Sequence, residues 1–397
     1  QDWSSEMQKR MFGRRGAGAR TAAEARKLRR VRLFMAVNQC NPAAGPPGVM
    51  KAFADAPRRG YSKGWAAMTL ESVAKRARVS TATVSRVLNN PDVVKESTRR
   101  RVLHAVEELN YHPDLNARTL AGGKSRTIGV IVSNLANPFF IDVFRALDGA
   151  ARQRGYDVLV ENTDYRVSRL EAAVRSMIGK RVAGLAVVVS EMNSPVTAEI
   201  RASGLAAVFY DVGAPGPRFV NIRVRYEAGM QRVVHYLHSL GHRRMAFIGH
   251  HTGLSPLQVR KRAFLACVRQ YGREVQSKTA LAADSPAGGV QAVRDVLASG
   301  FRPSAVVCVN DYMAVGVLRE LRARGISVPG DVSVTGFDNI ELADFTNPAL
   351  TTLHIPRAAI GQMAVEALLQ GERPEAVRRE VLLDPELVVR DSTGVAR

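Results

Sequence analysis

Residues 69–88 read Thr-Leu-Glu-Ser-Val-Ala-Lys-Arg-Ala-Arg-Val-Ser-Thr-Ala-Thr-Val-Ser-Arg-Val-Leu. This stretch holds two short helical patterns joined by a tight turn. Thr69 is suited to cap the first helix, because its hydroxyl can accept a hydrogen bond from a free backbone N–H group of the first turn. Apolar residues then recur at the spacing of one helical face, at Leu70, Val73, Ala74 and Ala77. A helix with one apolar face packs against a partner, so the stretch predicts a small helical domain.

The second helical pattern has a different outer face. Ser80 caps it, and the apolar residues Val84, Val87 and Leu88 are expected to face inward. Short side chains and one arginine remain outside, namely Thr81, Ala82, Ser85 and Arg86. Short outward side chains let a helix backbone come close to base edges, which is the geometry of a helix-turn-helix protein in the DNA major groove. Taken alone, the stretch is equally compatible with a helical hairpin that has a solvated polar face.

The residues that follow favour DNA binding. Ser97 is placed to cap a third helix over residues 98–109, which completes a three-helix core. Asn-Tyr-His-Pro then stands at residues 110–113 and Ala-Arg-Thr-Leu at residues 117–120. Together with Val-Ser-x-x-Thr-Val-Ser-Arg at residues 79–86, these motifs resemble the LacI/GalR family of bacterial transcription regulators. The resemblance covers roughly residues 68–397.

The resemblance implies a set of DNA contacts. In this family a hinge helix follows the Asn-Tyr-x-Pro motif and orders on DNA, and Leu120 matches the residue that wedges into the minor groove. A buried linker residue is the alternative for Leu120. We expect Arg86 and Thr81 to contact bases, with Ser85 and Thr83 nearer phosphates. The full set of expected DNA contacts is Thr69, Arg78, Ser80, Thr81, Ala82, Thr83, Ser85, Arg86, Asn89, Tyr111, Arg118 and Leu120.

Two residues depart from the family pattern. Arg78 stands in the turn where helix-turn-helix proteins usually have glycine. A left-handed arginine costs on the order of 1 kcal/mol, so we expect Arg78 to compensate by touching a phosphate. Asn116 replaces an alanine or aliphatic residue, and we expect it to weaken the pairing of two hinge helices.

The charge of the chain is strongly positive but unevenly placed. The formal net charge is +21, which favours association with polyanions such as DNA. Residues 1–67 contain 14 basic and 4 acidic residues, and they lack a steady hydrophobic period. We expect them to be a disordered basic extension that is not part of the native protein, because Met68 stands where family members usually begin. A basic arm that adds nonspecific DNA affinity is the alternative.

Cysteine and histidine give little sign of metal or redox chemistry. Cys40, Cys267 and Cys308 have neither paired nor metal-ligand spacing, so we expect no cofactor, no metal and a reducing compartment. We interpret the histidines of His250-His251 and of the pair at residues 235 and 238 as solvated or packing residues. No stretch approaches 18 uninterrupted apolar residues, so no membrane partner is expected and the predicted localisation is cytoplasmic.

From residue 127 onward, aliphatic strands alternate with amphipathic helices. Strands are predicted at residues 128–132, 156–160, 184–189, 206–210, 244–248, 305–309 and 332–336, with a helix at residues 139–154. This alternation is typical of an α/β fold with parallel, doubly wound sheets. About 270 residues exceed one such sheet, so two lobes are predicted, and the resemblance implies a core like that of periplasmic binding proteins.

The predicted domain boundaries follow these changes in pattern. They are residues 1–67 for the basic extension, 68–112 for the helix-turn-helix domain, 113–126 for the hinge helix and linker, and 127–397 for the effector-binding and dimerisation core.

Ligands of open parallel sheets bind at the carboxyl ends of the strands. On this basis and from the family motifs, the expected ligand contacts are Phe139, Phe140, Asp211, Arg225, Arg260, Asp311 and Asp338. A purely structural role, such as capping a helix, is the alternative for each. Arg225 stands where the family usually has a polar pair, which raises the hypothesis of an acidic or phosphorylated ligand, with a solvated arginine as the alternative.

The sequence therefore predicts a regulator and not an enzyme. It has no Gly-x-Gly-x-x-Gly after a strand, no phosphate-binding Gly-x-x-x-x-Gly-Lys and no Gly-x-Ser-x-Gly. We expect a homodimeric repressor that binds a near-palindromic double-stranded DNA operator and responds to a small effector, a sugar or sugar derivative. A solute-binding protein that delivers a sugar to a transporter is the alternative function.

Overall fold

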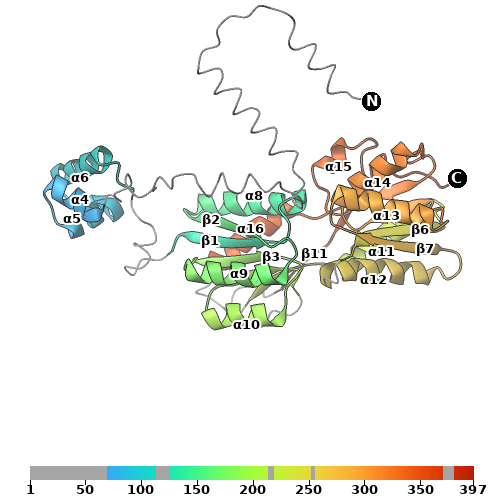
Figure 1. Ribbon diagram of the computed structural model, residues 1–397, viewed down its shortest axis with the longest axis horizontal. Coiled ribbons are helices and arrows are strands. Elements are labelled where there is room, and N and C mark those ends of the chain that lie inside the picture. Colours follow the sequence, from blue (N-terminus) through green and yellow to red (C-terminus); the bar gives the residue numbers. More distant parts are fainter. Residues whose placement is uncertain (1–68, 113–124, 213–218, 252–254, 370–379) are drawn as a thin grey trace, which may run out of the picture. The chain divides into compact units, whose positions relative to one another are not determined.

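The computed structural model describes residues 69–112, 125–212, 219–251, 255–369 and 380–397. They form two compact units, and the division between them falls in the sequence between Pro113 and Asp114 (Figure 1). The predictions for residues 1–68 and for the hinge residues Asn116, Arg118 and Leu120 lie outside the described residues.

The first unit is the predicted three-helix domain. It consists of α4 (Leu70–Ala77), α5 (Thr81–Asn89), the 3₁₀ turn η1 (Pro91–Val93) and α6 (Glu96–Glu108). Its core gathers small apolar side chains from all three α-helices: Val73, Ala74, Ala77, Val84, Val87, Val102 and Ala105. The predicted start of the third helix was wrong, because α6 begins before Ser97, with Lys95 at the N-cap and no side-chain capping bond.

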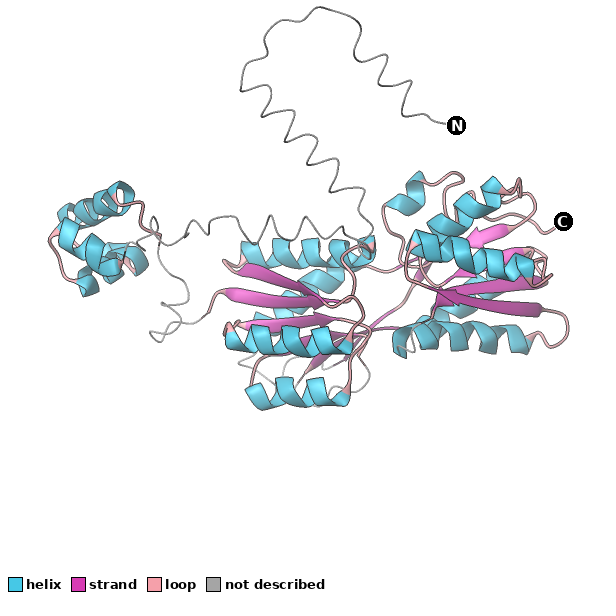
Figure 2. Ribbon diagram, in the orientation of Figure 1, coloured by secondary structure: helices cyan, strands magenta, loops and turns pink. Residues whose placement is uncertain are grey.

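The second unit begins with a lobe built on a six-stranded parallel sheet in the order β11-β5-β4-β3-β1-β2. Its strands are β1 (Thr127–Val132), β2 (Asp157–Asn162), β3 (Gly184–Val188), β4 (Ala207–Tyr210), β5 (Val220–Val224) and β11 (Glu380–Leu383). One face packs against α8 (Pro138–Gln153) and α16 (Arg357–Leu369), and the other against α9 (Val167–Gly179) and α10 (Ser194–Ser203). Helices cover both faces of the sheet, as in a doubly wound fold (Figure 2).

The second lobe has a four-stranded parallel sheet in the order β7-β6-β8-β9. Its strands are β6 (Arg244–His250), β7 (Gln276–Ala282), β8 (Ala305–Cys308) and β9 (Ser333–Thr335). The helices are α11 (Tyr226–Ser239), α12 (Ser255–Gln270), α13 (Pro286–Ala298), α14 (Asp311–Ala323) and the short α15 (Leu342–Phe345). An antiparallel pair, β10 (Thr352–His354) and β12 (Glu386–Val388), completes the lobe.

Within the described residues, the chain passes between the two lobes three times. The crossings run from β5 into α11, from β10 into α16 and from β11 into β12. Two of them are joined by a backbone hydrogen bond, since the N–H group of Arg225 donates to the carbonyl of Leu383 at 2.9 Å. The predicted fold class, a helix-turn-helix domain followed by a two-lobed parallel α/β core, is therefore confirmed.

Candidate functional site

The helix-turn-helix surface is shaped by two capping residues. The hydroxyl of Thr69 accepts a hydrogen bond from the Ser72 N–H group at 3.3 Å, and that of Ser80 accepts from the Thr83 N–H group at 3.2 Å. Both bonds satisfy donors that a helix start leaves free. The first bond fixes where α4 begins and the second where α5 begins. α5 then presents exposed Thr81, Ala82 and Arg86 on the face opposite its buried valines.

Arg78 adopts the left-handed conformation that its place in the turn predicts. Its φ and ψ are 56° and 50°, and its N–H group donates to the carbonyl of Lys75 at 3.3 Å. Val79 follows with a bond to the carbonyl of Ala74 at 3.0 Å, which closes the end of α4. This left-handed backbone conformation favours glycine, because a side chain is strained in it. Arg78 therefore occupies a position where glycine would be more stable.

The arginines of this unit differ in how they are paired. Arg76 of α4 binds Glu108 of α6 through two nitrogens, with Nη2 and Oε2 2.6 Å apart. In contrast, Arg78 and Arg86 are exposed and form no ion pair within the described part of the chain. These two cations remain available to phosphates or guanine edges.

The remaining predicted DNA contacts lie in several environments. Thr83 is half-buried and shares a hydrogen bond with Ser80, with the two hydroxyls 2.9 Å apart. Ser85 is half-buried on α5, and the ring of Tyr111 packs in the three-helix core at 9% exposure. Asn89 ends α5, and its side chain lies outside the described residues, as do Arg118 and Leu120.

In the second unit, a cavity of about 30 Å³ lies where the carboxyl ends of the strands of both lobes meet. Its lining combines aromatic rings with buried polar groups: Asn137, Phe139, Phe140, Tyr165, Val189, Ser190, Tyr210, Asp211, Tyr226, Leu257, Arg260, Asn310 and Asp338. Five of the seven predicted ligand contacts are brought together here. Side chains of both lobes therefore face one another across this small cavity.

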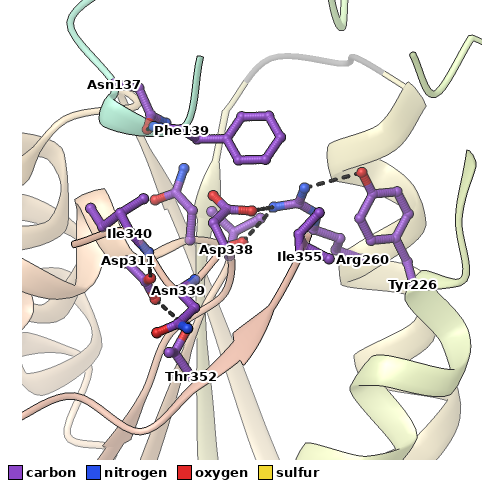
Figure 3. Close-up of polar contacts among 12 residues, drawn as sticks. Asn137, Phe139, Tyr226, Arg260, Asp311, Asp338, Asn339, Ile340, Thr352 and Ile355 are labelled. Carbon is purple, nitrogen blue, oxygen red and sulfur yellow. Dashed lines mark hydrogen bonds and ion pairs between the residues drawn. The ribbon is translucent and has the colours of Figure 1, made fainter. Parts of the chain in front are cut away.

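Arg260 of α12 is the central cation of the cavity, and it is 6% exposed. Its guanidinium lies over two neighbouring rings, with Cζ 4.4 Å from the ring centre of Tyr226 and 4.3 Å from that of Phe337. Nη1 donates to the carbonyl of Val309 at 2.8 Å, and Nη2 donates to Oη of Tyr226 at 3.1 Å (Figure 3). These contacts fix the plane of the guanidinium, which is the requirement for a directional ligand contact.

Asp211 follows β4 and has a left-handed φ of 57°. One carboxylate oxygen accepts the Val224 N–H group at 3.2 Å, and the other accepts the hydroxyl of Tyr226. Tyr226 in turn accepts from Arg260, so the three side chains form a chain of hydrogen bonds. Burial raises the pKa of Asp211 to about 7, although the hydrogen bond from Val224 and the charge of Arg260 act in the opposite direction.

Asp338 follows β9 in the loop that carries Gly-Phe-Asp-Asn at residues 336–339. Its φ is 104°, a conformation that side chains rarely adopt, and its carbonyl accepts a hydrogen bond from Arg357. Oδ1 lies 3.7 Å from Nη1 of Arg260, and burial raises the pKa of Asp338 to about 7. Three buried atoms of the lining have no hydrogen-bond partner among the described residues: Oδ1 of Asp338, Nε of Arg260 and Oη of Tyr210.

Two of the predicted ligand contacts, Asp311 and Arg225, lie outside the cavity lining. Asp311 is fully buried beneath the residues that line the cavity. Its carboxylate accepts hydrogen bonds from the Ile340 N–H group at 2.8 Å and from the Thr352 hydroxyl at 2.5 Å (Figure 3). Its neighbour Asn310 lines the cavity instead. Arg225 lies in a crossing between the lobes with its side chain 53% exposed, and it pairs with Asp384 at 3.1 Å.

Several lining residues were absent from the predicted set, among them the polar residues Tyr165, Tyr210, Tyr226 and Asn310. Tyr210 and Asn310 stand at or next to predicted strand ends, so the rule that selected Asp211 and Asp311 also reaches them. Tyr226 stands directly after Arg225, at the start of α11, where no predicted strand end marks it. Tyr165 lies in a turn after β2, where no pattern in the sequence marks it.

No group of three or more His, Cys, Asp or Glu side chains in the described part of the chain is arranged to hold a metal ion. None of the helices within the described ranges is long and apolar enough to span a bilayer. Cys267 and Cys308 are buried free thiols.

The chain combines a helix-turn-helix unit with a two-lobed α/β unit that holds a polar cavity. This combination defines a class of protein, the DNA-binding transcription regulators whose core has the fold of a ligand-binding protein. Comparison with known proteins identifies the family within this class. Residues 69–114 match the model of bacterial regulatory proteins of the lacI family, and residues 234–393 match that of a periplasmic binding protein-like domain. The chain is 33% identical to the HTH-type transcriptional repressor PurR of Photobacterium profundum, over 82% of this chain and 98% of that protein.

Solved structures agree with this assignment. The Lac repressor dimer bound to operator and the anti-inducer ONPF has 31% identity and a TM-score of 0.72, over 82% of this chain and 99% of that chain. A LacI family transcriptional regulator from Enterococcus faecium with bound ribose has 25% identity and a TM-score of 0.61, over 68% and 100%. The chain belongs to the lacI family of bacterial regulatory proteins, and it is a DNA-binding transcriptional regulator.

Proposed function

We propose that the protein is a ligand-gated repressor that acts as a homodimer on a near-palindromic operator. The observation that carries this proposal is the combination of two features in one chain. One is a capped helix with two exposed arginines nearby, and the other is an interlobe cavity whose lining keeps polar atoms without hydrogen-bond partners among the described residues. A ligand that changes the relation of the lobes alters the DNA affinity, and DNA then changes the ligand affinity by the same factor. The dimer is supported by the dimeric Lac repressor to which the chain is similar.

The proposed DNA contacts follow from exposure and chemistry. Arg86 and Thr81 are exposed on α5 and are proposed to contact bases, with Arg78 on a phosphate. Two such helices, one from each subunit, enter successive major grooves about one DNA turn apart. The hinge, with Leu120 as its minor-groove wedge, completes the proposed complex. The domain boundaries at residues 68–112, 113–126 and 127–397 remain part of this proposal.

The proposed effector is a carbohydrate or a small polar molecule with similar hydroxyl groups. Aromatic rings in the lining offer apolar surface to a sugar ring, while Oδ1 of Asp338 and Oη of Tyr210 offer partners to hydroxyl donors. The ribose-bound relative supports this class. An anionic ligand loses its main support, because Arg225 pairs with Asp384 away from the lining and Arg260 is already placed beside Asp338.

A thermal-shift screen tests the ligand class. Matched sets of a neutral sugar, its phosphate ester and its acid are added to the full chain, and each hit is confirmed by calorimetry. A rise in Tm with neutral sugars that Asp338→Ala abolishes supports the proposal, and a rise only with the phosphates or acids contradicts it.

The alternative of a solute-binding protein is not favoured, because it leaves the helix-turn-helix unit without a role. We likewise propose no catalytic activity for the cavity. As a DNA-binding repressor, the protein is proposed to act in the cytoplasm, where bacterial DNA lies.

A further inference from the structure

The carboxylate of Asp284 receives hydrogen bonds from both lobes. Asp284 follows β7 in the second lobe and is 8% exposed. Its Oδ1 accepts from Nδ2 of Asn310 at 2.7 Å within that lobe. Its Oδ2 accepts from residues of the first lobe, namely from Oη of Tyr165 at 2.5 Å and from Nδ2 of Asn137 at 3.2 Å, with Nδ2 of Asn134 more distant at 3.5 Å.

The two buried asparagines are held in one orientation. Oδ1 of Asn137 caps α8 by accepting the Phe139 N–H group at 3.1 Å, and Oδ1 of Asn310 caps α14 by accepting the Met313 N–H group at 2.9 Å. Each amide oxygen is therefore committed to a helix start, and each NH₂ group is left to point at Asp284. If Asp284 were replaced by asparagine, the NH₂ group of its amide would face at least one of these NH₂ donors, and no hydrogen bond could form between them.

Tyr165 reaches Asp284 from an unusual turn. Asp164 and Tyr165 both have left-handed φ values, 50° and 60°, which are rare for side chains of this size. The surrounding contacts hold this backbone in place, since the ring of Tyr165 lies 5.0 Å from that of His250 and its hydroxyl donates to Asp284. Burial, and then the charge of Asp284, raise the pKa of Tyr165 well above 10, so the hydroxyl remains a donor.

Three of the four donors also line the ligand cavity: Asn137, Tyr165 and Asn310. We propose that Asp284 is a positioning residue that holds the two lobes closed and aligns these three side chains for the ligand. Separation of the lobes removes the bonds from Tyr165 and Asn137 together, and this couples cavity geometry to lobe closure. The inference rests on the proposed ligand-gated function for its biological meaning.

Hydrogen exchange of the full chain tests this role without ligand or DNA, so its failure and that of the proposed function are distinguishable. The variant is Asp284→Asn, and the matched control is Asp295→Asn, an exposed residue of α13 that accepts a bond from Gln291 at 2.8 Å. We expect amides of residues 134–140 and 163–166 to exchange roughly tenfold faster or more in Asp284→Asn, as loss of a charge-assisted hydrogen bond implies. Strands β1 and β8 should keep their protection, and the control should match the wild type.

A swap variant separates positioning from packing. Asp284→Asn combined with Asn137→Asp returns the carboxylate to the pair from the other lobe, and an aspartate still caps α8. Recovery of protection at residues 134–140 in the double variant supports the proposal. Wild-type exchange in Asp284→Asn, acceleration that spreads evenly through β6 and β8, or loss of protection that the swap leaves unrecovered would each overturn it.

Discussion

Nη1 of Arg260 lies 3.7 Å from Oδ1 of Asp338, and both side chains are buried. Arg260→Ala leaves Asp338 as an uncompensated acid, and removal of one partner from a buried ion pair costs about 3–5 kcal/mol. We therefore expect a lower free energy of unfolding together with loss of ligand binding. Urea unfolding and calorimetry measure the two effects. As a control, Asp338→Asn should cost less stability, and equal stability of Arg260→Ala and wild type would contradict the role of the pair.

Arg86 is predicted to carry sequence discrimination. Arg86→Ala should reduce the preference for operator over random DNA by about 1–3 kcal/mol, because a base contact is lost. Fluorescence anisotropy at one fixed salt concentration gives the ratio. Arg101→Ala, which removes an exposed arginine of α6, is the matched control and should leave the ratio unchanged. If Arg86→Ala leaves it unchanged as well, Arg86 does not read bases.

Arg78 is predicted to lower the stability of the fold and to raise the affinity for DNA. Arg78→Gly removes the left-handed strain and should stabilise the chain by about 1 kcal/mol. The same variant should bind all DNA sequences more weakly, with the salt dependence reduced by about one phosphate contact. Chemical unfolding and a salt titration of binding test the two halves. Unaltered salt dependence would remove the phosphate contact from the proposal.

Asp311 predicts a dependence of stability on pH. Burial, and then the charge of Asp338, raise its pKa to about 8, whereas an unfolded aspartate has a pKa of about 3.9. Between about pH 4 and pH 8 the folded chain therefore binds more protons than the unfolded chain, so this group lowers stability as pH rises through that window. Asp311→Asn should flatten the fall in Tm over the same range. A fall as steep as in wild type would show that Asp311 is ionised without penalty.

The sequence predicted features that depend on neighbours along the chain. The caps at Thr69 and Ser80, the left-handed Arg78 and most strands of the two sheets all follow from local spacing. Three strands of these sheets, β5, β7 and β11, were not predicted. The start of β7, Gln-Ser-Lys, is exposed at the edge of its sheet and lacks an aliphatic pattern.

Features set by distant contacts were less accessible. The predicted end of β8 indicated which part of the chain lies at the cavity. The direction of each side chain there depends on contacts with residues that are distant in the sequence. Asn310 consequently lines the cavity, while Asp311 turns to Ile340 and Thr352. Arg225 was placed at the ligand because it stands where the family usually has a polar pair. Its partner Asp384, far along the chain, could not be identified from spacing.

Selection of DNA sequences by the full chain tests the central claim most directly. Random duplexes are bound, recovered and sequenced, and the affinity for the enriched duplex is then compared with that for a scrambled one at fixed salt. We predict a near-palindrome with half-sites about one turn apart and a preference of about 10³-fold or more. Recovery of unrelated sequences, with equal affinity for the enriched and scrambled duplexes, would contradict a role as a sequence-specific repressor.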